Sequence, residues 1–130
     1  MEQVQLPDLQ DLVIKTIAMP GDTNANGDIF GGWVLSQMDL GGAVLANCLS
    51  SCGRAVTVSI DSMSFINPIK IGDLVSCYAK VFKRGRTSVK IQVQIWTYDY
   101  INQKTKHVTH GIFTYVGINA EGKPVALIAD

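Results

Sequence analysis

The stretch DTNANGDIFGGWVLSQMDLGG, residues 22–42, decides how this chain folds. Its second half opens a segment, about 31–52, that is dense in apolar side chains and ends before Gly53, as helices commonly do. Asp39 lies in the middle of that segment, where burying an unpaired carboxylate costs several kcal/mol. The sequence therefore predicts one long helix carrying an acid that requires an explanation.

The predicted helix has a bulky face and a small face when its residues are placed about 100° apart. The bulky side chains lie opposite Asp39 and are expected to pack on a curved sheet: Trp33, Val34, Val44, Leu45 and Cys48. Apart from Leu35, the side chains around Asp39 are small: Gly32, Ser36, Gly42, Ala43, Ala46 and Ser50. Small residues let another backbone or a narrow ligand approach closely. Two interpretations remain open: a packing face in a dimer with Asp39 paired to a basic group, or a slot for a thin substrate chain beside a carboxylate.

Five segments have the pattern of strands. One precedes the helix, at 12–19, and four follow it, at 55–66, 74–83, 87–99 and 107–118. Short turns favour antiparallel neighbours, and a helix that is apolar on most sides has to be wrapped. The predicted fold class is therefore α+β: a hot-dog fold, with one long central helix wrapped by a five-stranded antiparallel sheet, as a single domain over 1–130.

Composition excludes several classes of function. The 130 residues carry 11 basic and 11 acidic side chains, so binding to nucleic acid or to an anionic membrane is not expected as the main role. The first ten residues lack a signal-peptide pattern, and no apolar run is long enough to span a membrane, so a cytoplasmic protein is expected.

No metal site is expected from the cysteines or histidines. Cys48, Cys52 and Cys77 form no CxxC pair, which fits reduced thiols. His107 and His110 are three residues apart in a strand, so their side chains are expected on opposite faces of the sheet, unable to share an ion.

The start of the helix offers hydrogen-bond donors. The N–H groups of the first turn have no partner within a helix, and Gly31 and Gly32 let a ligand approach them, as a polarised carbonyl or developing oxyanion would require. Gly32 and Asp39 are seven residues apart, which is roughly 10 Å along a helix. One helix therefore cannot bring both to the same carbonyl carbon, and the spacing predicts a dimer in which two chains face each other.

The loop before the helix supplies Asn24, Asn26 and Asp28. Such residues are common in loops because they form turns and cap helices, and Asp28 is placed to cap or support this one. An Asn side chain can equally orient a water molecule or a substrate carbonyl. The residues alone leave this choice open.

The segment KRGRTS, residues 83–88, is predicted to be a tight hairpin with three cations and two hydroxyl groups. It is either a solvated tip whose charges discourage edge pairing, or a phosphate-binding element using Arg84 or Arg86 with Thr87 and Ser88.

The segment MPGDTNANGDIFGGWVLSQMD, residues 19–39, resembles the YciA-type acyl-CoA thioesterases, hot-dog enzymes related to the cytosolic acyl-CoA hydrolases of animals. FINPIKIGD, GRTS and FTYVGI extend the resemblance over nearly the whole chain. It implies hydrolysis of an acyl-CoA thioester to a free acid and CoA, with no cofactor because CoA belongs to the substrate. It also implies dimers that assemble into a homohexamer, a trimer of dimers.

The resemblance assigns roles to residues. It implies that Asp39 is the general base or nucleophile and that Asn24 helps to place the water or the carbonyl. Backbone donors at Gly31 and Gly32 would polarise the thioester carbonyl, and the hairpin would bind CoA through Arg84, Gly85, Arg86, Thr87 and Ser88. Two other functions fit the residues less well. A non-catalytic acyl-CoA sensor would not need Asp39, and a hot-dog hydratase or dehydratase uses a His near the helix start, where 22–42 has none.

Overall fold

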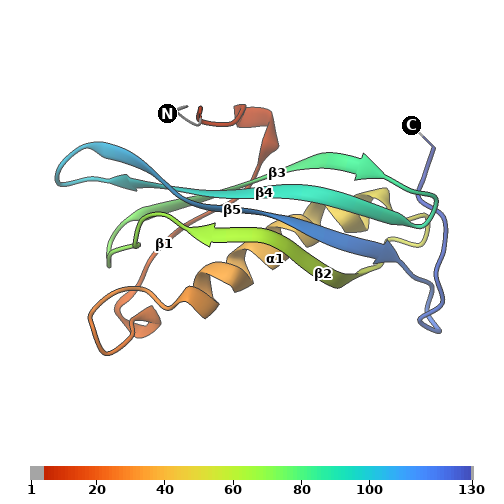
Figure 1. Ribbon diagram of the computed structural model, residues 1–130, viewed down its shortest axis with the longest axis horizontal. Helices are drawn as coiled ribbons and strands as arrows, with labels where there is room; N and C mark the ends of the chain where they lie inside the picture. Colours follow the sequence, from red (N-terminus) through yellow and green to blue (C-terminus); the bar gives the residue numbers. More distant parts are fainter. Residues whose placement is uncertain (1–4, 130) are drawn as a thin grey trace.

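A five-stranded antiparallel sheet lies over one helix in the computed structural model, which describes residues 5–129 (Figure 1). The helix is α1 (Gly31–Leu49), and the strands are β1 (Leu12–Ile17), β2 (Ala55–Phe65), β3 (Leu74–Arg84), β4 (Ser88–Asp99) and β5 (Lys104–Gly117). Two 3-10 turns, η1 (Leu9–Asp11) and η2 (Pro20–Asp22), flank β1. The predicted α+β hot-dog arrangement is confirmed. No helix within residues 5–129 is long and apolar enough to cross a membrane.

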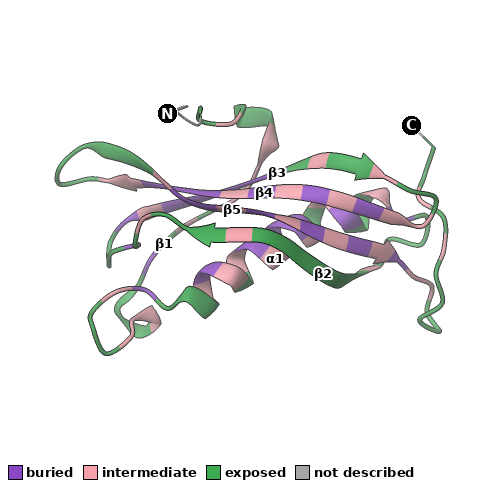
Figure 2. Ribbon diagram, in the orientation of Figure 1, coloured by how far each residue is buried: buried purple, intermediate pink, exposed green. Residues whose placement is uncertain are grey.

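The strand order is β1-β3-β4-β5-β2. β3, β4 and β5 follow one another as antiparallel neighbours, as their short turns predict. β2 does not pair with β3, which follows it in the chain; it pairs with β5 and forms the opposite edge of the sheet from β1. Figure 2 shows β2 as a largely exposed strand, whereas most of β4 and β5 alternates between buried and intermediate residues, and Val58 on β2 is 55% exposed.

The core lies between α1 and the three central strands. On β4 the predicted alternation is confirmed, because Val89, Ile91, Val93 and Ile95 are all buried and form one cluster with Val34 and Met38 of α1. Tyr115 and Phe113 on β5 complete that cluster.

The helix presents its small residues to the sheet, which corrects the predicted faces. Gly41, Gly42 and Ala46 are buried together with Val34 and Met38, whereas Val44 and Cys48, predicted to face the sheet, are exposed. The physical reason is the close approach of helix and strands: a Cβ at residue 41 would lie 2.5 Å from Sγ of Cys77. The bulk that fills the core comes from the sheet, so the inner glycines form neither a substrate slot nor a helix-packing face.

Two boundaries differ by three residues from those predicted, and the other ends of the elements agree within two residues. α1 ends at Leu49 instead of residue 52, because Ser50 has an extended backbone and forms a bridge with Leu127 of the returning C-terminal segment. β5 begins at Lys104, three residues earlier than the polar turn suggested.

A bulge in β5 overturns the prediction for the two histidines. Gln94 pairs with His110 and Trp96 pairs with His107, so Val108 is an extra residue between Thr109 and His107 in the ladder with β4. His107 and His110 therefore lie on the same face of the sheet, where their rings stack with centroids 5.2 Å apart. Burial, with the charge of His110, lowers the pKa of His107.

Candidate functional site

The Asp39 carboxylate is held by two hydroxyl groups. Thr57 on β2 donates a hydrogen bond from Oγ1 to Asp39 Oδ1 over 2.6 Å. The Tyr115 hydroxyl on β5 lies 3.0 Å from the same oxygen and 2.8 Å from the backbone oxygen of Asp39. Thr57 and Tyr115 are direct cross-strand partners, so the register of β2 and β5 brings both hydroxyl groups to one carboxylate.

Asp39 keeps one oxygen without a protein partner. Within residues 5–129, Oδ2 accepts no hydrogen bond and the carboxylate forms no ion pair with a basic side chain. The side chain is only half-buried, beside the exposed edge strand β2. Asp39 is therefore a carboxylate fixed by one oxygen, and pairing with a basic group of its own chain is ruled out for the described residues.

Tyr115 was not singled out in the sequence. Its hydroxyl passes beneath the helix at Gly42, where an added Cβ would come within 2.2 Å of it. Two features of the sequence could have pointed to Tyr115. One is the alternation in β5, where Phe113 and Tyr115 are both buried, and the other is Gly42, a glycine inside the helix that leaves room for a large aromatic residue.

The first turn of α1 has free donors, as predicted. Phe30 is the N-cap residue and contributes no side-chain cap. Among the described residues, the N–H groups of Gly31, Gly32 and Trp33 donate to no acceptor, and the helical ladder begins with Val34 N–H to the Phe30 carbonyl. A Cβ at Gly32 would meet nothing within 4 Å, and one at Gly31 would make only an ordinary contact with Phe65. Packing within the chain therefore does not require either glycine.

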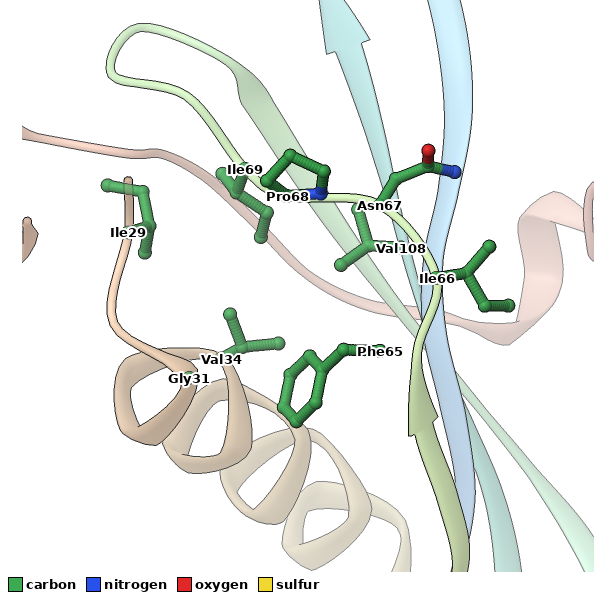
Figure 3. Close-up of a pocket in the computed structure, with 9 residues that line it drawn as sticks. All are labelled: Ile29, Gly31, Val34, Phe65, Ile66, Asn67, Pro68, Ile69 and Val108. Carbon is green, nitrogen blue, oxygen red and sulfur yellow. The ribbon is translucent and has the colours of Figure 1, made fainter. Parts of the chain in front are cut away.

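An apolar pocket of about 280 Å³ opens beside this first turn (Figure 3). Its walls come from the helix start, the end of β2, the segment that follows it, and β5: Ile29, Gly31, Val34, Phe65, Ile66, Asn67, Pro68, Ile69 and Val108. The ring of Phe65 points from β2 toward the helix and forms one side of the opening. The Asn67 amide group donates to the His107 carbonyl, so the segment after β2 is held to β5.

The loop before α1 is organised by Asn24. Its Oδ1 accepts hydrogen bonds from the backbone N–H groups of Asn26 at 2.9 Å and Asp28 at 3.2 Å. Its Nδ2 group donates to no residue within 5–129. Asp28 was expected to cap or support the helix start; it pairs with Lys70 and does not cap α1, so the capping alternative is wrong. The Asn26 side chain is exposed and makes no hydrogen bond to a described residue.

The hairpin between β3 and β4 lies at the other end of α1. Arg84 donates from Nη2 to the Ile128 carbonyl, and the Arg86 carbonyl accepts from Leu127 N–H at 2.9 Å. Ile128 N–H in turn donates to Leu49, the last residue of the helix. The Arg86 side chain is exposed. Gly31 and the hairpin are thus separated by the length of α1, about 28 Å for 19 residues, and one chain does not bring them together.

The thiols and acids form no metal centre in the described part of the chain. No group of three His, Cys, Asp or Glu residues within 5–129 could hold an ion. Cys48, Cys52 and Cys77 are all free thiols. Burial raises the pKa of the Cys77 thiol to about 12, so this side chain acts as a small apolar group under the helix.

Comparison with known proteins places this geometry in a family. Residues 26–100 match the model of the Thioesterase superfamily. The chain is 50% identical over 121 residues to the acyl-CoA thioester hydrolase YciA of Escherichia coli, a match that covers 90% of each protein.

Solved structures give the same assignment. A hexameric thioesterase from Yersinia pestis has a TM-score of 0.88 and 45% identity, covering 96% of this chain and all of its own. A hexameric hot-dog fold thioesterase of Campylobacter jejuni has a TM-score of 0.87 and 41% identity, covering 94% of this chain and 93% of its own. With a family model over most of the chain and close relatives over nearly all of it, the chain belongs to the thioesterase superfamily and, within it, to the YciA-type acyl-CoA thioester hydrolases.

Proposed function

We propose that this protein hydrolyses acyl-CoA thioesters to a free acid and CoA, with Asp39 as the general base or nucleophile. The observation that carries the proposal is the Asp39 carboxylate, which two hydroxyl groups hold by one oxygen while the other has no partner among the described residues. A thioester carbonyl is reactive enough for a positioned base and a pair of oxyanion donors to suffice. Activation of water and direct attack by Oδ2 are both compatible with this geometry.

The active unit is proposed to be a homodimer in which Asp39 of one protomer faces the first turn of α1 in the other. Asp39 and Gly32 of one helix are roughly 10 Å apart along its axis, too far to act on one carbonyl. The exposed edge strand β2 and the exposed apolar residues Leu40 and Val44 on the outer face of α1 give a second copy a surface to cover. A homohexamer is proposed because the Yersinia and Campylobacter relatives are hexameric.

Asn24 is proposed as the assisting residue of the loop. Its Nδ2 group is free to hydrogen bond to a water or to the thioester, because only its Oδ1 is used within the loop. In the acyl-CoA hydrolase of Staphylococcus aureus, which is 32% identical, the Asn and the Asp replaced by Ala in solved variants are fifteen residues apart. Asn24 and Asp39 have the same separation, whereas Asn26 and Asp39 do not.

The two ends of the substrate are assigned to the two ends of α1. The hairpin residues Arg84, Gly85, Arg86, Thr87 and Ser88 are proposed to bind the phosphate groups of CoA, with the exposed Arg86 as the main cation. The acyl chain is proposed to enter the apolar pocket beside Gly31, because that pocket opens next to the donors that would polarise the carbonyl. The Staphylococcus aureus relative has been solved with butyryl-CoA and with CoA.

The proposed reaction needs no cofactor, since the chemistry uses a carboxylate, backbone donors and water. A cytoplasmic location is proposed because Cys48 and Cys52 are exposed, unpaired thiols, as is usual in a reducing compartment. The proposed activity involves neither nucleic acid nor a membrane.

Thiol release from a series of acyl-CoAs tests the proposal. The wild-type protein is expected to turn over at least part of the series, and Asp39→Asn is expected to lose at least about 100-fold in kcat because it removes the base. Asp39→Asn should still bind CoA thioesters, since the hairpin and the pocket are unchanged. Binding without turnover by the wild-type protein would instead identify an acyl-CoA sensor, and an undiminished rate in Asp39→Asn would place the base elsewhere.

A further inference from the structure

Tyr115 is a buried polar residue that the mechanism above leaves unused. It lies on β5 with 1% of its surface exposed, in the core cluster, and its ring centroid is 6.4 Å from that of Phe113. Its hydroxyl reaches α1 only because residue 42 is a glycine: an added Cβ there would lie 2.2 Å from the hydroxyl oxygen and 2.8 Å from Cζ. The helix accepts a glycine in its interior, which costs about 1 kcal/mol relative to alanine, and the tyrosine hydroxyl occupies the resulting space.

The hydroxyl of Tyr115 acts as a donor at this place. Burial, followed by the hydrogen bond and the charge of Asp39, raises the pKa of Tyr115 far above its ordinary value. The phenol therefore keeps its proton throughout the pH range in which a carboxylate base works. Beside it stand Thr57 from β2 and Cys77 from β3, whose buried thiol also stays protonated, and no described basic side chain pairs with Asp39.

The donor set is asymmetric with respect to the two carboxylate oxygens. Thr57 and Tyr115 both approach Oδ1, and no described group approaches Oδ2. Thr57 donates to Oδ1, and the single proton of the Tyr115 hydroxyl lies between Oδ1 and the backbone oxygen of Asp39, so the two side chains fix the carboxylate in one orientation. They leave Oδ2 as the oxygen that takes a proton from water or attacks the carbonyl carbon.

We propose that Tyr115 is a positioning residue for the reaction: it orients the carboxylate of Asp39 without touching the substrate. This inference rests on the proposed function of Asp39 and adds a residue to it. Burial of the ring prevents direct contact with a ligand, so Tyr115 is not itself catalytic. The competing interpretation is purely structural, in which the hydroxyl only ties α1 to β5 through the backbone oxygen of Asp39.

The test variant is Tyr115→Phe, which removes the hydroxyl and keeps the ring. With butyryl-CoA as substrate, kcat is expected to fall about tenfold, the equivalent of one hydrogen bond, while KM changes less than about twofold.

Phe113→Leu is the matched control. Phe113 is on the same strand, fully buried and without a hydrogen bond to Asp39, so its truncation should lower the Tm and leave kcat within about twofold of the wild-type value. If Tyr115→Phe lowers the Tm in the same way and also leaves kcat unchanged, the role is structural and the inference is wrong.

A crystal structure of Tyr115→Phe gives a readout that does not depend on activity. The inference predicts that the Asp39 side chain then occupies more than one rotamer, and a carboxylate held as in the wild type would overturn it. If the wild-type protein hydrolyses no acyl-CoA, the proposed function fails, and this crystal structure still tests the link between Tyr115 and Asp39.

Discussion

The carboxylate of Asp39 is supported by neutral hydroxyl groups, and this choice of partners suits a base. A cation beside a carboxylate stabilises the charge strongly and reduces its tendency to take a proton. Thr57 and Tyr115 orient the group without neutralising it. The structure therefore answers why an acid stands in an apolar helix: it lies at the border of the core, where two strands supply donors and the outer side stays open.

Asn24 holds the loop through Oδ1 and is proposed to assist the reaction through Nδ2, and a single substitution can separate these two functions. Asn24→Asp keeps an oxygen that can accept the N–H groups of Asn26 and Asp28, but it lacks the Nδ2 donor. We expect the Tm to change by no more than a few degrees and kcat to fall at least about tenfold, measured by thiol release. Asn26→Asp, at an exposed side chain in the same loop, is the control and should retain activity within about twofold. Equal losses in both variants would show a general effect of charge in the loop.

Single residues with an unusual chemical setting could be predicted from the sequence, and residues defined by register could not. Asp39 and the glycines at the helix start stand out because an acid or a glycine in an apolar helix is costly. Tyr115 looks like an ordinary inward aromatic residue until the pairing of β5 with β2 places it opposite Thr57. His107 and His110 were assigned to opposite faces because a bulge at Val108 leaves no mark in the alternation.

At the scale of the helix, two groups of glycines have opposite functions. Gly41 and Gly42 allow close packing on β3 and β5, whereas Gly31 and Gly32 leave room outside the chain. Gly41→Ala is expected to destabilise the protein by about 1–3 kcal/mol, because its Cβ would overlap Cys77 and Val13.

Gly32→Ala is expected to keep or slightly raise the Tm, since alanine favours helix by up to about 1 kcal/mol. It should lower kcat/KM about tenfold by obstructing the donors at the helix start. Thermal unfolding and thiol release, each measured on Gly32→Ala and on Gly41→Ala, check the contrast between the two positions. Unchanged kcat/KM in Gly32→Ala would remove the helix start from the site.

The hairpin can be tested through the part of the substrate it is proposed to bind. Arg86→Gln removes an exposed cation and should leave the Tm unchanged, while KM for butyryl-CoA rises about threefold to tenfold. A butyryl thioester of N-acetylcysteamine lacks the nucleotide and serves as the control substrate, so its kinetics should be the same in both proteins. A KM for butyryl-CoA that does not change would identify the tip as a solvated turn.

The pocket beside Gly31 predicts a dependence on acyl length. Phe65→Ala removes one side of its opening, so the ratio of kcat/KM for long to short acyl-CoAs should increase. Each additional buried methylene contributes about 0.8 kcal/mol, which corresponds to roughly fourfold in kcat/KM. A series of saturated acyl-CoAs measures the ratio, and an unchanged profile would place the acyl chain elsewhere.

The helix and the strands could be predicted from the periodicity of their apolar residues, but the contacts between these elements could not. The helix and five strands were correctly expected because alternation and glycine-bounded apolar runs are local signals. The prediction that Val44 and Cys48 face the sheet was wrong. How closely α1 packs on the sheet depends on Cys77 and Tyr115, which come from strands distant in the sequence. The position of β2 at the edge depends on the crossing of residues 66–73, which no short-range pattern specifies.

For the whole molecule, the exposed parts of one chain are the parts that a second chain completes. β2 is an edge strand with a largely exposed face, and α1 exposes Leu40. Asp39 and the free donors of Gly32 lie roughly 10 Å apart along α1. A symmetric dimer would place two such sets face to face, because an isologous interface pairs the same surface of both subunits. The central claim is thus that each site uses Asp39 of one protomer and the helix start of the other.

Mixed dimers of Asp39→Asn and Gly32→Ala chains test this claim most directly. Co-expression with two different tags and tandem purification gives assemblies whose content of mixed dimers is determined by native mass spectrometry. If each site is shared, one site of every mixed dimer has both groups intact and the other has neither, so a mixed dimer should have about half of the wild-type kcat. Activity no greater than the average of the two parent proteins would contradict the claim and place the whole site within one chain.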